Sequence, residues 1–88
     1  MILPSKHLSE ERALIVIGSE ILLELEKPRD VSELWDRVRD AHNARSADSS
    51  LSYDWFTLAL TFLFAVLAVE IRDGLVVTTA RGQNDSLD

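Results

Sequence analysis

The chain of 88 residues contains no cysteine, and its nine Lys and Arg residues are outnumbered by 15 Asp and Glu residues. Without cysteine, the chain has neither a disulfide framework nor a thiolate metal site. The formal net charge is −6 and the sequence pI is about 4.7. Nonspecific binding to nucleic acid, or to an anionic membrane, needs a basic surface. The composition therefore opposes both kinds of partner.

Signals for catalysis are also lacking. The two histidines, His7 and His42, have no second metal ligand at helical spacing, so we interpret them as surface or helix-capping residues. General acid–base chemistry needs titratable groups that converge in a pocket, whereas the acids of this chain are spread over predicted solvent faces. We therefore predict that the protein is not an enzyme and has no metal site and no cofactor.

The N-terminal stretch, MILPSKHLSEER, lacks the charged region and following apolar run of a secretory signal. With 47% hydrophobic residues the chain is not disordered overall, and 88 residues correspond to one small domain. We predict a cytoplasmic protein with an N-terminal arm at residues 1–8, a single domain at residues 9–78 and a disordered tail at residues 79–88.

The most apolar segment is residues 53–72, YDWFTLALTFLFAVLAVEIR, in which the 15 positions from Trp55 to Val69 carry no charge. This run is too long for a strand and shorter than the roughly 20 apolar residues of a membrane span. We interpret the segment as a central buried helix around which the other elements pack. Its main apolar side is formed by Phe56, Ala59, Leu63, Val66 and Leu67.

The apolar arc of this helix covers well over half of its circumference, more than the surface helix of a globular protein needs. Two interpretations stay open. Either neighbouring helices and a hairpin cover the whole arc, or the edge formed by Trp55, Phe62 and Val69 is left for a partner. In the second case the isolated protein should self-associate, with Trp55 and Phe62 as the main anchors.

Residues 9–27 predict a first helix, with Ser9 as its N-cap and with Pro28 preventing its continuation. Gly18 lies on the predicted buried face, where it costs about 1 kcal/mol of helix propensity relative to alanine. A close helix–helix crossing is the usual compensation. The other residues of this face are Leu14, Ile15, Ile17, Ile21, Leu22 and Leu25.

Val16 and Leu23 lie two turns apart on the opposite side of this first helix. Single exposed apolar residues are common, but two in register form a second candidate contact patch. The neighbours that we expect on this side are Arg12, Ser19, Glu20 and Glu26.

Residues 30–44 predict a second helix. Asp30 and Glu33 have the spacing of a capping box, and Glu33 and Arg37 have the spacing of an i,i+4 ion pair. His42 near the end of this helix suits the negative end of the helix dipole. The apolar stripe that we expect to face the core consists of Val31, Leu34, Trp35, Val38 and Ala41.

A polar loop leads to Ser52, the predicted N-cap of the central helix. Beyond that helix, Asp73-Gly74 between two apolar runs predicts a hairpin with a type I′ turn. We place its short strands at about residues 69–72 and 75–78, so the first strand takes the last residues of the central segment. Three helices followed by a two-stranded wing predict a mainly α, winged-helix-like fold.

DNA-binding winged helices insert the third helix into the major groove, where its side chains contact base edges and phosphates. Between Asp54 and Arg72 this chain has no Lys, Arg, Asn or Gln. We therefore predict no direct, sequence-specific binding of nucleic acid by the central helix.

Four segments resemble a known family: the opening LPSKH, the ELW of the second helix, SYDWFTLALTFLFAVLAVEI, and the closing DGLV. Over residues 2–77 the chain is similar to the small middle component of the prokaryotic ABC-three component systems, of the class called middle component six. Members of this family often carry a charged or glycine residue within the third helix. This chain has LTFLFAVLAV instead, which leaves open which helix face is the interface.

The resemblance implies a conflict system in which an ABC or SMC-like ATPase, an effector-bearing protein and this middle component are encoded together. It implies that the chain is a non-enzymatic winged-helix adaptor, which links the ATPase to the effector-bearing subunit in anti-phage or anti-plasmid defence. Two alternatives stay open, a winged-helix transcription regulator and a small membrane-associated protein.

Overall fold

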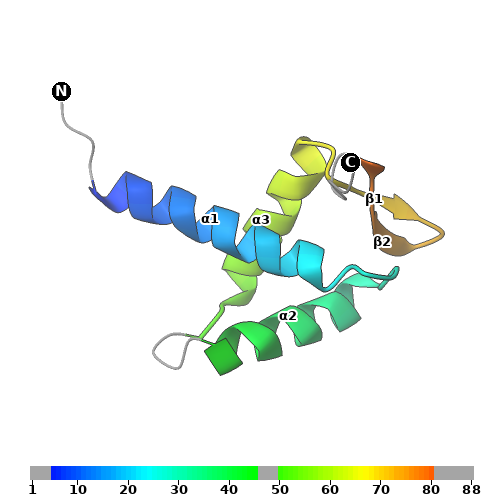
Figure 1. Cartoon of the computed structure of the whole chain (residues 1–88), viewed down its shortest axis with the longest axis horizontal. Coiled ribbons are helices and arrows are strands. Elements are labelled where there is room, and N and C mark those ends of the chain that lie inside the picture. Colours follow the sequence, from blue (N-terminus) through cyan, green and yellow to red (C-terminus); the bar gives the residue numbers. More distant parts are fainter. Residues whose placement is uncertain (1–4, 46–49, 81–88) are drawn as a thin grey trace, which may run out of the picture.

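The computed structural model describes residues 5–45 and 50–80, without the side chains of residues 5–9. The elements come in the predicted order: α1 (Ser5–Leu23), α2 (Val31–Arg45), α3 (Tyr53–Ala65), β1 (Val69–Arg72) and β2 (Leu75–Thr78). Figure 1 shows that α1 crosses α3, and that the hairpin lies beside the linker between α1 and α2. Three helices followed by an antiparallel hairpin confirm the winged-helix-like fold.

One core of buried apolar side chains joins all five elements. Every helix and strand contributes to it, and α1 and α3 form the most extensive contact between helices. Within the described residues, no helix is long and apolar enough to cross a membrane. The core consists of Ile17, Ile21, Leu25, Leu34, Val38, Leu51, Phe56, Ala59, Leu60, Leu63, Ala68, Val69 and Val76.

The hairpin forms as the Asp73-Gly74 pair predicts. Asp73 has φ 56° and Gly74 has φ 79°, which are the positive values that both central residues of a type I′ turn require. The strands β1 and β2 have the predicted bounds, and Arg72 pairs with Leu75 next to the turn. A third chain segment joins this sheet, because the backbone N–H of Arg29 donates to Val76 O at 3.2 Å and the N–H of Val76 donates to Arg29 O at 2.7 Å.

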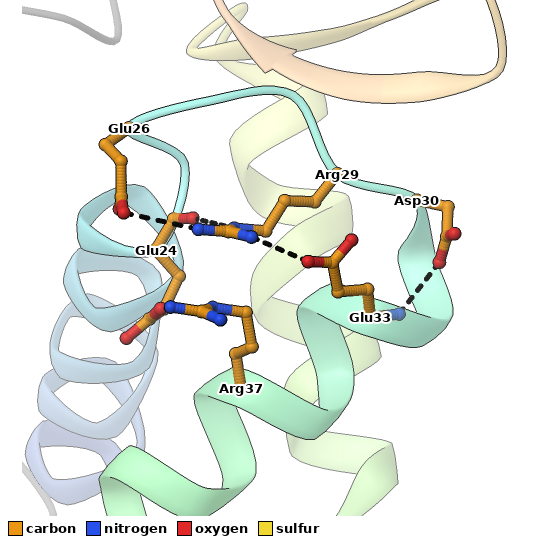
Figure 2. Close-up of polar contacts among 6 residues, drawn as sticks. All are labelled: Glu24, Glu26, Arg29, Asp30, Glu33 and Arg37. Atoms are coloured by element: carbon orange, nitrogen blue, oxygen red, sulfur yellow. Dashed lines mark hydrogen bonds and ion pairs between the residues drawn. The ribbon is translucent and has the colours of Figure 1, made fainter.

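The side chain of Arg29 is the main polar group of the interior, with a relative exposure of only 1%. Its Nε donates to the backbone oxygen of Glu24 at 2.6 Å, Nη1 lies 2.6 Å from Glu33 Oε2, and Nη2 lies 3.3 Å from Glu26 Oε2 (Figure 2). A buried charge is costly unless it is paired and hydrogen-bonded. Arg29 meets this condition by joining the end of α1 to the start of α2, while its backbone holds β2.

The start of α2 confirms half of the predicted capping box. Asp30 Oδ1 accepts a hydrogen bond from the backbone N–H of Glu33 at 2.8 Å (Figure 2). The Glu33 carboxylate is engaged by Arg29 instead of reaching back to the cap. The predicted Glu33–Arg37 pair was therefore wrong: Arg37 Nε donates to Glu24 Oε1 on α1 at 3.0 Å. The buried guanidinium outcompetes the exposed one for this carboxylate.

The bounds of α1 differ from the prediction at both ends. The helix begins at Ser5, so Ser9 is a helical residue rather than the N-cap, and residues 5–8 belong to α1 rather than to an arm. It ends at Leu23 instead of Lys27. The turn tightens there, because the N–H of Leu25 donates to Leu22 O at 3.1 Å and the side chain of Leu25 enters the core.

The central helix is shorter than the apolar run, since α3 ends at Ala65 and Leu67 has a left-handed φ of 65°. The N–H of Ala68 donates to Leu63 O at 2.8 Å and the N–H of Leu67 donates to Phe64 O at 3.1 Å. This pair of bonds is a Schellman motif, which stops a helix. Val69 therefore lies in β1, with β2 beside it, and not on a helix.

Some sequence-based predictions fall on residues 1–4, 46–49 and 81–88, which lie outside the described residues. They include part of the arm, part of the polar loop and most of the tail predicted to be disordered. Of that tail, Thr79 and Ala80 are described, and the N–H of Thr79 donates to Ala68 O at 3.0 Å.

Leu63→Ala should destabilise the fold by about 2–5 kcal/mol, because a large side chain in a small core is truncated. Leu63 is 5% exposed and lies over Gly18 of α1, where an added Cβ would be 3.6 Å from Leu63 Cδ2. Chemical denaturation of both proteins measures the difference. A melting temperature lowered by only a degree or two would contradict the burial of Leu63.

Arg29→Lys should cost about 2 kcal/mol although it keeps the charge, because an ammonium group cannot serve acceptors arranged for a planar guanidinium. Denaturant titration followed by circular dichroism measures the change. Glu26→Gln is the matched control, since the side chain of Glu26 is 65% exposed and exposed pairs contribute about 1 kcal/mol or less. Equal effects of the two substitutions would show that Arg29 does not join the elements.

Candidate protein interface

The exposed side of α3 carries Asp54 and Thr61 and, beside them, a row of large apolar side chains. Leu58 is 50% exposed, Phe62 43% and Val66, at the C-cap of the helix, 40%. These residues are four positions apart, so they form one stripe along the helix, which we call the α3 stripe. The opposite face of α3, formed by Phe56, Ala59, Leu60 and Leu63, is buried in the core.

Local bonds at both ends hold the α3 stripe in place. Ser52 Oγ accepts from the N–H of Trp55 at 3.1 Å, which confirms the predicted N-cap. The Schellman motif closes the other end, where the N–H of Val66 donates to Phe62 O at 3.0 Å. The stripe therefore belongs to a helix with defined ends and has a fixed orientation relative to the core.

The predicted edge of Trp55, Phe62 and Val69 is not one surface. Phe62 is exposed, Trp55 is half-buried against the core, and Val69 is 2% exposed within β1. Placing Val69 beside the other two was wrong because the helix stops before it. Trp55 instead borders a hollow whose other lining residues are Ala13, Ile17, His42, Ser50, Leu51 and Ser52.

Sequence reasoning missed Leu58 and Val66 as surface residues. The helical wheel placed Val66 on the main apolar side, which was expected to face the core. In the structure the buried side of the helix is narrower than this prediction, and Val66 lies at its exposed edge. The spacing did carry a signal, because residues 58 and 66 lie four positions before and four positions after Phe62 and therefore fall on one helix face.

A second exposed apolar set lies on α1, where Val16 is 44% exposed and Leu23 is 68% exposed. Their role as an interface stays a prediction. Ile15, predicted to face the core, is 63% exposed and lies beside Val16. We call Ile15, Val16 and Leu23 the α1 patch. It lies on the side of the helix that points away from the buried Ile17 and Ile21.

Glu20 was expected beside Val16 and Leu23 on the outside of α1, and this was wrong. Glu20 is 7% exposed, because its carboxylate faces the last turn of α2. Glu20 Oε1 lies 2.9 Å from His42 Nδ1, and Glu20 Oε2 lies 3.1 Å from Arg45 Nη2. His42 is in the last turn of α2, as predicted, and its partner there is a carboxylate of α1. These three residues join the two helices.

The surroundings of the α3 stripe are acidic. From Tyr53 to Thr78 the chain has three carboxylates and one guanidinium, and that guanidinium, on Arg72, is paired with Glu70. The unpaired acids of this segment, as far as the structure describes them, are Asp54 and Asp73. A phosphate backbone would therefore meet apolar and negative groups on α3, not the basic and amide groups that bind DNA.

Signs of a catalytic or metal centre are absent from residues 5–45 and 50–80, as far as their side chains are described. No group of three or more His, Asp or Glu side chains there is arranged to hold a metal ion. The buried titratable groups, around Arg29 and around Glu20, join helices to each other. Of the surfaces described, the two exposed apolar sets are the best candidates for a functional site.

The chain matches a family model described as ABC-three component (ABC-3C) system Middle Component 6, over residues 3–80. The match covers most of the sequence, so the chain belongs to this family. No curated protein and no solved structure matches the chain.

Phe62→Asp should strongly reduce the binding of a hydrophobic dye by the isolated protein while its circular dichroism stays unchanged. The reason is that Phe62, 43% exposed, belongs to the exposed apolar surface and is not among the side chains that form the core or pack against it. Thr61→Asp is the matched control, because Thr61 is an exposed neighbour outside the stripe. Loss of the fold would mean that Phe62 is a core residue. A folded variant that still binds the dye as the wild type does would move the interface to the α1 patch.

Proposed function

We propose that this chain is a non-enzymatic winged-helix adaptor, which links an ABC or SMC-like ATPase to an effector-bearing subunit. The system would be one of prokaryotic anti-phage or anti-plasmid defence, acting in the cytoplasm. The single observation that carries the proposal is the α3 stripe. At the position where a DNA-binding winged helix carries its reading residues, this chain exposes Leu58, Phe62 and Val66.

Membership of the Middle Component 6 family supports the proposal, since a middle component belongs to a system with other components. The exposed apolar surface fits that setting. Large exposed apolar side chains gathered on one helix face are typical of protein–protein contacts. Aromatic anchors such as Phe62 often dominate the energy of these contacts.

An adaptor needs two separate contact surfaces, and the chain has two candidates on different helices. The α3 stripe and the α1 patch each lie on the side of their helix that is turned from the core. A specific protein contact covers roughly 800 Å² on each partner. Each apolar set is small by this measure, so we expect each to be the centre of a larger contact with a polar rim.

Co-purification tests the adaptor role. A tagged wild-type chain expressed in its native host should bring down both the ATPase and the effector-bearing subunit. Phe62→Asp should lose one of them, and Leu23→Asp should lose the other, since each change places a charge in one apolar set. Thr61→Asp should retain both. Retention of both partners by both Asp variants of the apolar sets would contradict the assignment of these surfaces.

A mobility-shift titration separates the adaptor from a transcription regulator. The isolated chain should not retard duplex DNA at any salt concentration, because phosphate contacts need basic groups that α3 lacks. Retardation that weakens steeply as salt rises would favour the regulator, since such a slope reports the number of phosphates neutralised.

A further inference from the structure

Leu67 has an unusual backbone conformation directly beyond the α3 stripe. Its φ is 65°, in the left-handed region, and it follows the C-cap residue Val66. Glycine is the usual residue at this position of a Schellman motif, because a Cβ is unfavourable there. Leucine lacks the short polar side chain that lets Asp or Asn adopt this conformation more easily.

The fold gains little from this leucine. Its side chain is 61% exposed, and it is not among the side chains that form the core or pack against it. The turn itself is held by backbone atoms: the N–H of Leu67 donates to Phe64 O, the Leu67 oxygen accepts from Thr79 Oγ1, and the next N–H, of Ala68, donates to Leu63 O. Any residue that tolerates a positive φ would make the same bonds.

Asp73 provides the internal comparison. It is the other non-glycine residue with positive φ among the described residues, at 56°. Asp is a residue type that visits this region, and it stands at a turn position where Asp-Gly is favoured. The conformation of Asp73 is thus explained by local chemistry, whereas that of Leu67 is not.

We propose that Leu67 is a contact residue for the partner that covers the α3 stripe, and that this partner presents an apolar surface rimmed by Lys or Arg. This rests on the proposed adaptor function. Strained residues persist where function requires them, and a large apolar side chain next to Val66 extends the stripe from the helix onto the turn before the wing. The contact surface then runs from Leu58 to Leu67.

The negative charge of the chain indicates which kind of partner covers the α3 stripe. Along the chain, Asp54 precedes the α3 stripe and Asp73 on the wing follows Leu67. Neither acid has a basic partner in the described residues. A basic rim on the partner would complement them and accelerate association. A second copy of this chain fits less well, because each copy carries a net charge of −6 and would bring the same acids to the contact.

Two measurements on Leu67→Gly test the proposal. The free variant should melt about 5 °C higher, because glycine relieves the strain at this position. Its affinity for the partner that Phe62→Asp loses, measured with the co-expressed proteins of the system, should fall at least about tenfold, since a buried apolar contact is lost. A gain in stability combined with a loss of binding is not expected of a residue that serves the fold.

Asp73→Gly makes the same kind of change at the other positive φ and is the control for stability. Because it also removes an acid of the proposed contact, it should slow association as Asp54→Lys does. Leu67→Asn should also lose affinity, since it suits the backbone but removes the apolar side chain. Asp54→Lys should slow association with a basic-rimmed partner.

Three results would overturn the inference. Unchanged affinity of Leu67→Gly would remove Leu67 from the contact. A lower melting temperature of this variant would show that the leucine stabilises the fold. A wild-type dimer that becomes monomeric in Leu67→Gly would make the occupant a second copy. If the wild-type chain captures neither partner, the proposed adaptor function is wrong. If only the proposal for Leu67 is wrong, the wild-type chain still captures both partners.

Discussion

The fold depends on the burial of one guanidinium. Arg29 lies in the short linker between α1 and α2, and its side chain binds the backbone oxygen of Glu24, just beyond the end of α1, and the carboxylate of Glu33 in the first turn of α2 (Figure 2). Its backbone pairs with Val76, so the same residue also fixes the wing. A buried cation must have its donors satisfied in fixed directions. Arg29 thereby ties the end of α1 to the start of α2 and holds the hairpin against the linker between them.

This arrangement leaves α3 covered on one side only. The helix buries Phe56, Ala59, Leu60 and Leu63 beneath α1 and the hairpin, and the chain has no further described element to cover its other side. The winged-helix-like layout thus leaves one side of its third helix turned outwards, and the large side chains exposed there are apolar rather than basic. Architecture alone does not determine function here, and the residues on the outer face of α3 carry the distinction.

Much of the fold could be predicted because local chemistry sets where several of its helices and strands begin and end. Ser52 and Asp30 cap helices through their own side chains, and Asp73-Gly74 supplies the two positive φ values of the turn. What the sequence did not indicate depends on distant partners. The burial of Arg29 needs acceptors from two helices, and Glu20 is buried only because His42 and Arg45 lie opposite. The end of α3 was missed for another reason, since a leucine in the left-handed region has no sequence signal. This error counted Val69 on the edge of the helix although the predicted first strand also begins there.

The exposed apolar residues differ in what they imply for the candidate site. Val16 and Leu23 are single side chains on a well-formed helix, where exposure has little conformational cost and little diagnostic value. The α3 stripe is more informative, since its three members lie in one row on the same helix face. Leu67 is the most informative, because it is exposed and also occupies a backbone conformation that disfavours it. A residue that is costly in the free protein and unused by its core is best explained by a contact made outside it. The proposed partner surface therefore centres on the end of α3 rather than on the middle of α1.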